Sequence, residues 1–198
     1  PEPFTMYEAI RQLPAGTSMI VTRDGASEPR PYFSIASILR DAVNEHRHYS
    51  DDERAAIIAD SVRESVRYHL VSDVPVGAFL SSGRDSSTIV ALASETTTSL
   101  QTVTLRFSEY AGTEKDEAPL AAQVAMQYGT KHRAITLCGE EFRNELPRAL
   151  EAMDQPSFDG LNSYFVCKAA AELGWKVALS GTGGAELFGG YTTFRIIP

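Results

Sequence analysis

Short apolar runs alternate with amphipathic stretches between residues 76 and 180, and no other feature of the sequence constrains the fold as much. The apolar runs predict four buried strands, at residues 76–80, 102–107, 133–137 and 176–180. The stretches between them predict helices at residues 86–94, 119–128, 140–153 and 164–173. This alternation is typical of an α/β fold with a doubly wound parallel sheet, whose functional site lies at the carboxyl ends of the strands.

The first fifty residues have a different character. Short extended segments separated by turns are expected at residues 7–13, 18–22 and 30–34. Residues 37–51 are polar and are interpreted as a linker. They contain His46 and His48, but a metal site there is disfavoured because no third ligand lies nearby.

A long helix is expected from residue 51 to about residue 71. Ser50 and Glu53 form a capping box at its start, in which each residue satisfies a backbone N–H group of the other. Apolar residues spaced four apart predict one buried face: Ile58, Val62, Val66 and Leu70.

The overall composition limits the partners of the chain. The 198 residues are 43% hydrophobic and 22% charged, which is ordinary for a globular domain with a sizeable core. A net charge of -8 disfavours a broad surface for nucleic acid or anionic membrane, because phosphates would be repelled. There is no membrane-spanning run or signal peptide, and two cysteines make no disulfide or metal framework, so a cytoplasmic location is expected. The chain begins without Met and stops after a glycine-rich stretch, so we interpret it as part of a longer protein.

A polar loop, Ser81-Ser82-Gly83-Arg84-Asp85-Ser86, joins the first predicted strand directly to a helix. Such a loop suits an anion, because unpaired N–H groups and the positive end of the helix dipole face it. Gly83 permits a tight turn and close backbone approach, and the serine hydroxyls can donate to phosphate oxygens. Asp85 would repel phosphate unless Mg²⁺ lay between them, so the loop predicts a metal–phosphate site. The alternative is an ordinary polar helix N-terminus with Asp85 near the cap.

Neither Gly-x-x-x-x-Gly-Lys-Ser/Thr nor Gly-x-Gly-x-x-Gly fits this loop. It resembles the Ser-Gly-Gly-x-Asp-Ser pyrophosphate loop of the ATP-pyrophosphatase enzymes, which activate a carboxylate or carbonyl as an adenylate. Residues 177–191 resemble the asparagine synthetase motif Leu-Ser-Gly-x-Gly-x-Asp-Glu-Leu-Phe-Gly-Gly-Tyr, and residues 74–77 also match that family. The leader, with Leu-Pro-Ala-Gly at residues 13–16, resembles the tail of the family's glutaminase domain.

The resemblance implies three parts: the tail of an N-terminal glutaminase domain (residues 1–36), a linker (37–51) and an ATP-binding synthetase domain truncated at its C-terminus (52–198). It implies that ammonia from glutamine reaches the synthetase domain. There, ATP and Mg²⁺ convert aspartate to β-aspartyl-AMP with release of pyrophosphate, and ammonia displaces AMP to give asparagine. The fragment alone is expected to be inactive, and a homodimer is a further possibility.

The resemblance also assigns roles by match of motif. The residues implied to hold pyrophosphate, with Asp85 as the Mg²⁺ ligand, are Ser81, Ser82, Gly83, Asp85 and Ser86. The residues implied to contact the adenosine or AMP part are Phe79, Leu105, Ser180 and Gly181. Asp85 and Glu186 are the catalytic candidates, although Glu186 would point away from the metal if the family's local geometry is kept.

Three residues depart from the family pattern. Ser82 replaces a glycine, which is tolerable if its φ is negative. Arg84 replaces an apolar residue and either adds a phosphate contact or points to solvent, the second being slightly favoured. Ala185 replaces an aspartate expected to share the Mg²⁺–pyrophosphate, and alanine offers no oxygen ligand. Two alternatives therefore stay open: a degenerate nucleotide-binding module without turnover, and a related amidotransferase acting on another carboxylic acid.

Other candidates have ordinary structural explanations. In the loop at residues 154–160, Asp154 or Asp159 could contact a substrate, but a turn before a helix explains them equally well. His132 is interpreted as structural, and Cys138 and Cys167 have no nearby general base.

Overall fold

The computed structural model describes residues 2–45, 48–155, 157 and 159–196. His46 of the His-x-His pair and two positions of the loop at residues 154–160 lie outside the described residues. The chain divides into two compact units, residues 1–56 and 57–198, which are described separately. None of the described helices combines the length and the apolar character needed to cross a membrane.

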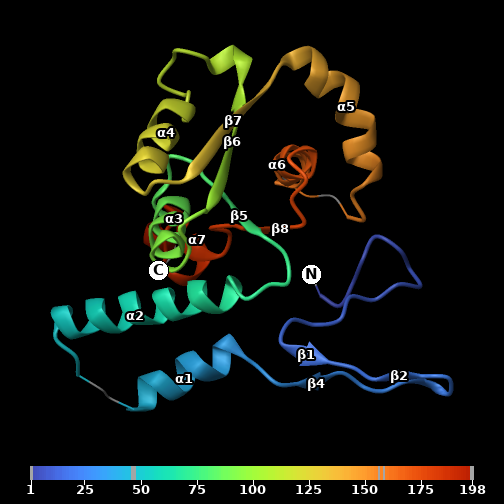
Figure 1. The fold of residues 1–198 in the computed structure, drawn as a ribbon. Helices are drawn as coiled ribbons and strands as arrows, with labels where there is room; N and C mark the ends of the chain where they lie inside the picture. The colour runs from blue at the N-terminus through green and yellow to red at the C-terminus, as the bar shows by residue number, and fades with distance from the viewer. Residues whose placement is uncertain (1, 46–47, 156, 158, 197–198) are drawn as a thin grey trace. The chain divides into compact units, whose positions relative to one another are not determined.

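The described residues of unit 1 form two small antiparallel ladders, one helix and the beginning of a second helix, α2 (Asp51–His69) (Figure 1). The elements are β1 (Thr17–Ser18) paired with β4 (Arg30–Pro31), β2 (Val21–Thr22) paired with β3 (Gly25–Ala26), and α1 (Ile35–Glu45). Gly25, at the start of β3 directly after the turn that follows β2, has φ 132°, a conformation that favours glycine. Helix α1 occupies much of the segment interpreted as a linker. No described residue of this unit is buried.

The prediction of an extended segment at residues 7–13 is wrong. In this part of the chain the structure forms only an isolated β-bridge, between Phe4 and Arg11. The Thr5 hydroxyl bonds to the carbonyl oxygens of Tyr7 and Ile10, at 3.1 and 2.9 Å. These local side-chain bonds fold the segment into a turn and compete with pairing to another strand.

Helix α2 (Asp51–His69) begins at the predicted capping box. The Ser50 N–H donates to Glu53 Oε2 at 2.8 Å, and the Glu53 N–H donates to Ser50 Oγ at 3.2 Å. The Ser50 N–H holds the pKa of the Glu53 carboxyl below its usual value. The predicted buried stripe is correct only in the second half of the helix: Val66 is buried, whereas Ile58 is 48% exposed. The reason is that only the end of α2, at Val66, and Leu70 directly after the helix pack on the core.

Unit 2 is built on the predicted parallel sheet. Its strands are β5 (Val76–Phe79), β6 (Gln101–Phe107), β7 (Lys131–Leu137) and β8 (Val177–Leu179). Their order is β7-β6-β5-β8, and all neighbours are parallel. The chain thus moves outward from β5 to β7 and then returns to the other side of β5. The carboxyl ends of β5 and β8 therefore lie at the topological switch point, where doubly wound sheets bind ligands.

Helices cover both faces of this sheet (Figure 1). Figure 1 shows α3 (Arg84–Thr96) and α4 (Ala118–Gln127) on one side, and α5 (Gly139–Glu151) and α6 (Gly160–Glu172) on the other. Shorter helices are η1 (Ser108–Tyr110), α7 (Gly184–Leu187) and α8 (Thr193–Ile196). The doubly wound α/β fold predicted from the alternation is confirmed.

The core beneath α3 and α4 is rich in small side chains, including the fully buried Ala78, Ala93 and Ala121. Because alanine is small, the helices approach the sheet closely, and they hold β5 and the start of α3 in a defined position. Leu80, 2% exposed, is the last core residue before the polar loop. Its N–H donates to Val103 O at 2.9 Å, and its carbonyl accepts from the Thr104 hydroxyl.

Candidate functional site

The loop after β5 leads into α3 with Gly83 as the N-cap residue. Gly83 has no side chain to cap the helix, so the first-turn N–H groups of α3 have no side-chain acceptor there. Its φ of -72° and ψ of 154° suit any residue, and an added Cβ would meet only Ser81 Oγ, at 3.1 Å. A positive φ is therefore not the reason for glycine here. Because Gly83 provides no capping side chain, the N–H groups of the first turn of α3 can bind an anion.

Ser86 holds this loop together from within. Its side chain is buried, and its Oγ accepts from the Ser81 N–H at 3.1 Å and lies 2.8 Å from Ser81 Oγ. The same hydroxyl is 3.2 Å from the carbonyl oxygens of Ser81 and Gly83. Ser81 Oγ in turn accepts from the Gly83 N–H at 3.1 Å. Ser86 thus shapes the loop, and its direct contact with a phosphate stays a prediction.

The loop after β8 is a tight turn with few side chains. The Thr182 N–H donates to Ser180 Oγ at 3.2 Å, and the two hydroxyls are 2.8 Å apart. Gly183 has φ 97°, in the left-handed region that favours glycine, and it is the N-cap residue of α7. The Gly184 N–H donates to Gly181 O at 3.2 Å, which closes the turn.

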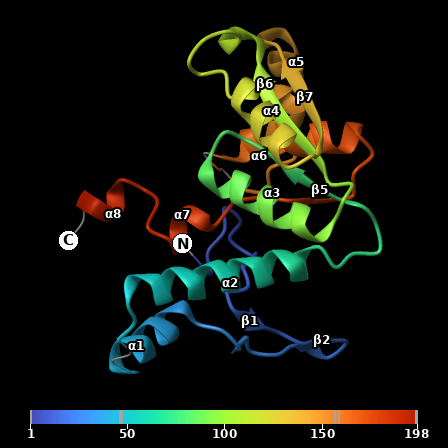
Figure 2. The same ribbon diagram turned by 60° about the vertical axis from the view of Figure 1, so that its left-hand side comes forward.

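The two loops meet at Asp85. A Cβ atom on Gly181 would lie 2.9 Å from Asp85 Cβ and 3.1 Å from the Ser86 N atom. A Cβ atom on Gly184 would lie 2.7 Å from Asp85 Oδ2. Glycine at position 181 therefore permits the close approach of the two backbones, and glycine at position 184 leaves room for the Asp85 carboxylate. Figure 2 shows α7 beside the start of α3. The carboxylate of Asp85 is exposed at the switch point, between the two loops.

Glu186, in α7, is engaged by a nearby tyrosine. The Tyr191 hydroxyl donates to Glu186 Oε1 at 2.8 Å. This bond raises the pKa of Tyr191, and the negative charges of Glu186, Asp159 and Asp85 raise it further. Glu186, Asp159 and Asp85 are therefore acidic groups that all act on Tyr191. The Glu186 carboxylate is held by the Tyr191 hydroxyl, and its catalytic role stays a prediction.

Comparison with known proteins gives the family of this site. The family described as "Asparagine synthase" matches residues 57–197, which is most of the chain. The chain belongs to the asparagine synthase family. It is 34% identical over 197 residues to asparagine synthetase [glutamine-hydrolyzing] 1 of Bacillus subtilis, and 35% identical over 201 residues to a putative asparagine synthetase of Mycobacterium tuberculosis. Each match covers 98% of this chain and 29% of the relative.

A more distant relative has a different name. "Amidase chry2" of Gibberella zeae is 27% identical over 207 residues, covering 96% of this chain and 30% of that protein. The chain thus spans less than a third of the length of these relatives. The domain assignment to the asparagine synthase family is established, and the reaction of the whole protein is a separate question.

Two residues implied to contact the adenosine part lie at or near the ends of neighbouring strands of this asparagine synthase domain. Phe79 is the last residue of β5 and is partly buried. Leu105 of β6 lines a small cavity on the α5–α6 side of the sheet, together with Ile135, Phe165 and Lys168. Both adenosine contacts stay predictions.

Two other candidates of the asparagine synthase domain have local structural partners, and a third lies at the start of a helix. His132 Nδ1 is 3.0 Å from the Thr102 hydroxyl, near the amino ends of the strands, and burial lowers the pKa of His132. Cys138 Sγ accepts from the Glu141 N–H at 3.4 Å as the cap of α5. Asp159 is the N-cap residue of α6 without a side-chain capping bond.

Sequence reasoning gave no role to Gly184 or Tyr191. The Gly-Gly pair at residues 183–184 lies where a strand turns into a helix, and it could have indicated close approach of another segment. The hydrogen bond between Tyr191 and Glu186 has no sequence signal of its own, because it depends on the fold of the four intervening residues.

The donor set fits a Mg²⁺ ion that arrives with phosphate. Among the residues that the structure describes, no group of three or more His, Cys, Asp or Glu side chains could hold a metal ion alone. Mg²⁺ bound to phosphates usually takes only one or two protein carboxylates, and phosphate oxygens and water complete its coordination. Asp85, exposed beside the bare N-terminus of α3, provides one such carboxylate. Ala185 provides none.

Proposed function

We propose that this domain binds ATP with Mg²⁺ in the crevice between the loops after β5 and β8. In the full-length protein it would convert aspartate to β-aspartyl-AMP and pyrophosphate, and ammonia released from glutamine would displace AMP to form asparagine. The observation that supports this most is the position of Asp85. Gly181 and Gly184 bring the second loop against it, at the open N-terminus of α3.

The contribution of the described residues is positioning and neutralisation of charge. The first-turn N–H groups of α3 and the helix dipole would hold phosphate oxygens. Asp85 would hold the Mg²⁺ that neutralises the leaving pyrophosphate, and bound ATP supplies the adenylyl group. The Ser86 hydroxyl would keep the loop in shape before nucleotide arrives, so that little reorganisation is needed on binding.

Unit 1 would then be the tail of a glutaminase domain (residues 1–36) with its linker. The support is that this unit has no buried residue among those described, while it exposes many large apolar side chains. A segment of this size without a core needs further polypeptide to cover its apolar groups. Relatives such as the Bacillus subtilis asparagine synthetase are more than three times as long as the matched region, and a full-length protein of that length would contain such polypeptide. The required ammonia would come from this glutaminase domain.

Two observations support other outcomes. Relatives named amidases indicate that an acid other than aspartate could be the acceptor in a related amidotransferase. Ala185, without an oxygen ligand, is compatible with a nucleotide-binding module that has lost turnover. Pyrophosphate release by the full-length protein, measured with aspartate and with a panel of other carboxylic acids, separates these cases.

The first experiment is calorimetric titration of this chain with ATP, with and without Mg²⁺. The proposal expects binding that tightens when Mg²⁺ is present, because Asp85 then attracts the metal–phosphate instead of repelling phosphate. Affinity that ignores Mg²⁺ would favour the degenerate module. No binding by either this chain or the full-length protein would contradict an ATP site.

A further inference from the structure

The two facing loops carry very little charge. Residues 80–86 and 180–185 contain one acidic side chain, Asp85, and one basic side chain, Arg84. The triphosphate of ATP has several negative charges, and a single Mg²⁺ held by one carboxylate leaves much of that charge uncompensated. In a chain with a net charge of -8, the guanidinium of Arg84 is the one cationic side chain within these loops.

Arg84 is the first residue of α3 and is exposed. Other arginines of unit 2 form ion pairs, such as Arg63 with Asp60 and Arg106 with Asp116. In contrast, no described residue forms a hydrogen bond or ion pair with the Arg84 guanidinium. Its side chain is thus available to a ligand.

The direction of a first-turn side chain favours contact with an anion. Cα–Cβ bonds in a helix tilt toward its N-terminus, so the long side chain of Arg84 has the reach to extend past the end of α3, where the open amides point. Asp85 follows about 100° further around the helix and faces Gly181 and Gly184. An anion at this helix end would therefore have Asp85, through a metal, on one side and Arg84 on another.

We propose that Arg84 is a phosphate-binding residue that contacts the β- or γ-phosphate of the nucleotide. A guanidinium matches the geometry of phosphate oxygens and keeps its charge at all relevant pH values. The Arg84 guanidinium would supply positive charge to the phosphates, whereas Ala185 has no oxygen atom in its side chain to bind a further metal ion. The inference rests on the proposed function, because it assumes nucleotide at this site.

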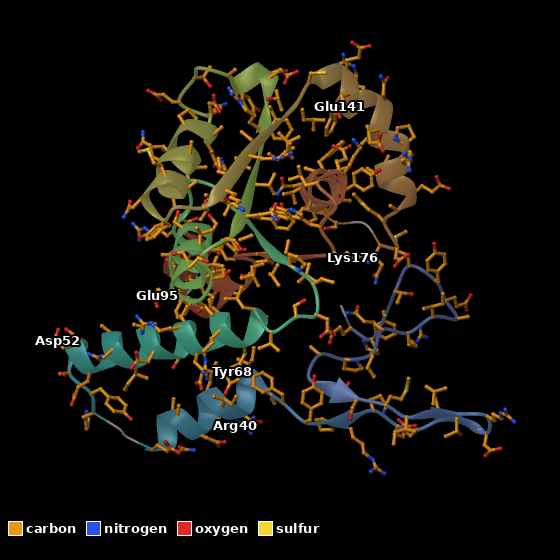
Figure 3. The ribbon with its side chains drawn as sticks, in the orientation of Figure 1. Arg40, Asp52, Tyr68, Glu95, Glu141 and Lys176 are labelled. Carbon is orange, nitrogen blue, oxygen red and sulfur yellow. The ribbon has the colours of Figure 1, made fainter. Side chains whose placement is uncertain are left out.

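The test compares ATP and AMP binding to the chain and three variants by calorimetry, across a series of Mg²⁺ concentrations. Arg84→Leu removes the charge at an exposed position, and Arg84→Lys retains it. The matched control is Lys176→Leu, which removes an exposed positive charge just before β8, at the opposite end of the strand from the loops (Figure 3).

Arg84→Leu should weaken ATP binding about tenfold, as expected for loss of one charge-assisted phosphate contact, and should leave AMP binding nearly unchanged. Its ATP affinity should also depend more steeply on Mg²⁺. Arg84→Lys should recover part of the loss, and Lys176→Leu should resemble the unaltered chain. Equal ATP affinity in Arg84→Leu and the unaltered chain would overturn the proposed role of Arg84. An equal loss of affinity for ATP and for AMP would do the same. Neither result would contradict the ATP site itself. Failure of the unaltered chain and the full-length protein to bind ATP would instead contradict the proposed function.

Discussion

The loops after β5 and β8 are both short and polar, and both follow a strand at the switch point. The loop at residues 80–86 contributes functional groups: the carboxylate of Asp85, the open amides of α3 and the hydroxyl network of Ser86. The loop at residues 180–185 contributes space, because Gly181 and Gly184 leave room for Asp85. The proposed nucleotide site therefore depends on glycines without side chains on one loop as much as on polar side chains on the other.

This difference predicts different consequences of mutation. A change in the first loop should alter ligand binding with little effect on folding where the side chain is exposed. A larger residue at Gly181 of the second loop should disturb both ligand binding and folding, because the added atoms meet the backbone of the first loop.

The largest effect on ligand binding is expected for Asp85→Asn. This change removes the carboxylate at the meeting point of the loops, so the tightening of ATP binding by Mg²⁺ should be lost, a change on the order of tenfold or more. Stability should change little because Asp85 is exposed. Calorimetry with and without Mg²⁺ measures the first quantity, and thermal unfolding the second. The matched control is Asp73→Asn, an exposed acid just before β5, at the other end of the strand. Full retention of the Mg²⁺ effect in Asp85→Asn would exclude Asp85 as the metal ligand.

A substantial effect on both stability and binding is expected for Gly181→Ala. The new Cβ would lie 2.9 Å from Asp85 Cβ and 3.1 Å from the Ser86 N atom, so the backbone must shift. We expect a loss of about 1–3 kcal/mol in the free energy of unfolding, together with weaker ATP binding. Gly83→Ala is the comparison in the other loop. Its φ is -72° and its Cβ would meet only Ser81 Oγ, so urea unfolding should show a much smaller loss. Equal losses in the two variants would break the contrast between the loops.

Most of unit 2 could be predicted from the sequence because periodicity reports burial directly. The strand expected at residues 76–80 is Val76–Phe79, and the one expected at residues 102–107 is Gln101–Phe107. Parallel order also followed from the alternation, because each crossover carries a helix. The first loop was found for the same reason: a buried strand, a polar turn and a helix follow one another without interruption.

The limits of sequence reasoning are local and tertiary. Ile58 fits the helical stripe of α2 but lies beyond the part of the helix that reaches the core, and no periodicity marks where a core ends. Residues 7–13 satisfy a strand pattern, yet the Thr5 hydroxyl folds them locally. The motif implied that Ser86 holds pyrophosphate, and that contact stays a prediction. The inward orientation of Ser86 depends on the position of Ser81, which only the folded loop defines.

A moderate effect on stability is expected for Ser86→Ala. The variant loses the hydroxyl that joins Ser81 to the start of α3, and the Ser81 N–H is left without this acceptor. We expect a loss of about 1–2 kcal/mol in the free energy of unfolding and a modest loss of ATP affinity. Ser82→Ala, an exposed position in the same loop, should change stability far less. If chemical denaturation shows equal stability for the two variants, Ser86 does not hold the loop together.

The smallest effect is expected for Ala185→Asp. This change adds a carboxylate to the second loop, in addition to that of Asp85 in the first loop. Ala185 is partly buried. A Cβ atom built on Gly190 would lie 3.1 Å from the Cβ atom of Ala185, so there is little room for a larger side chain toward Gly190. If the new carboxylate reaches the metal, Mg²⁺ should tighten ATP binding by a further factor of about five or less, because a partly exposed charge is screened by solvent. Ala185→Asn adds similar volume without charge and is the control. A gain in Mg²⁺ dependence for aspartate but not asparagine would indicate that the second loop can also carry a functional group. Equal behaviour of the two variants would mean that its contribution is confined to the space left by its glycines.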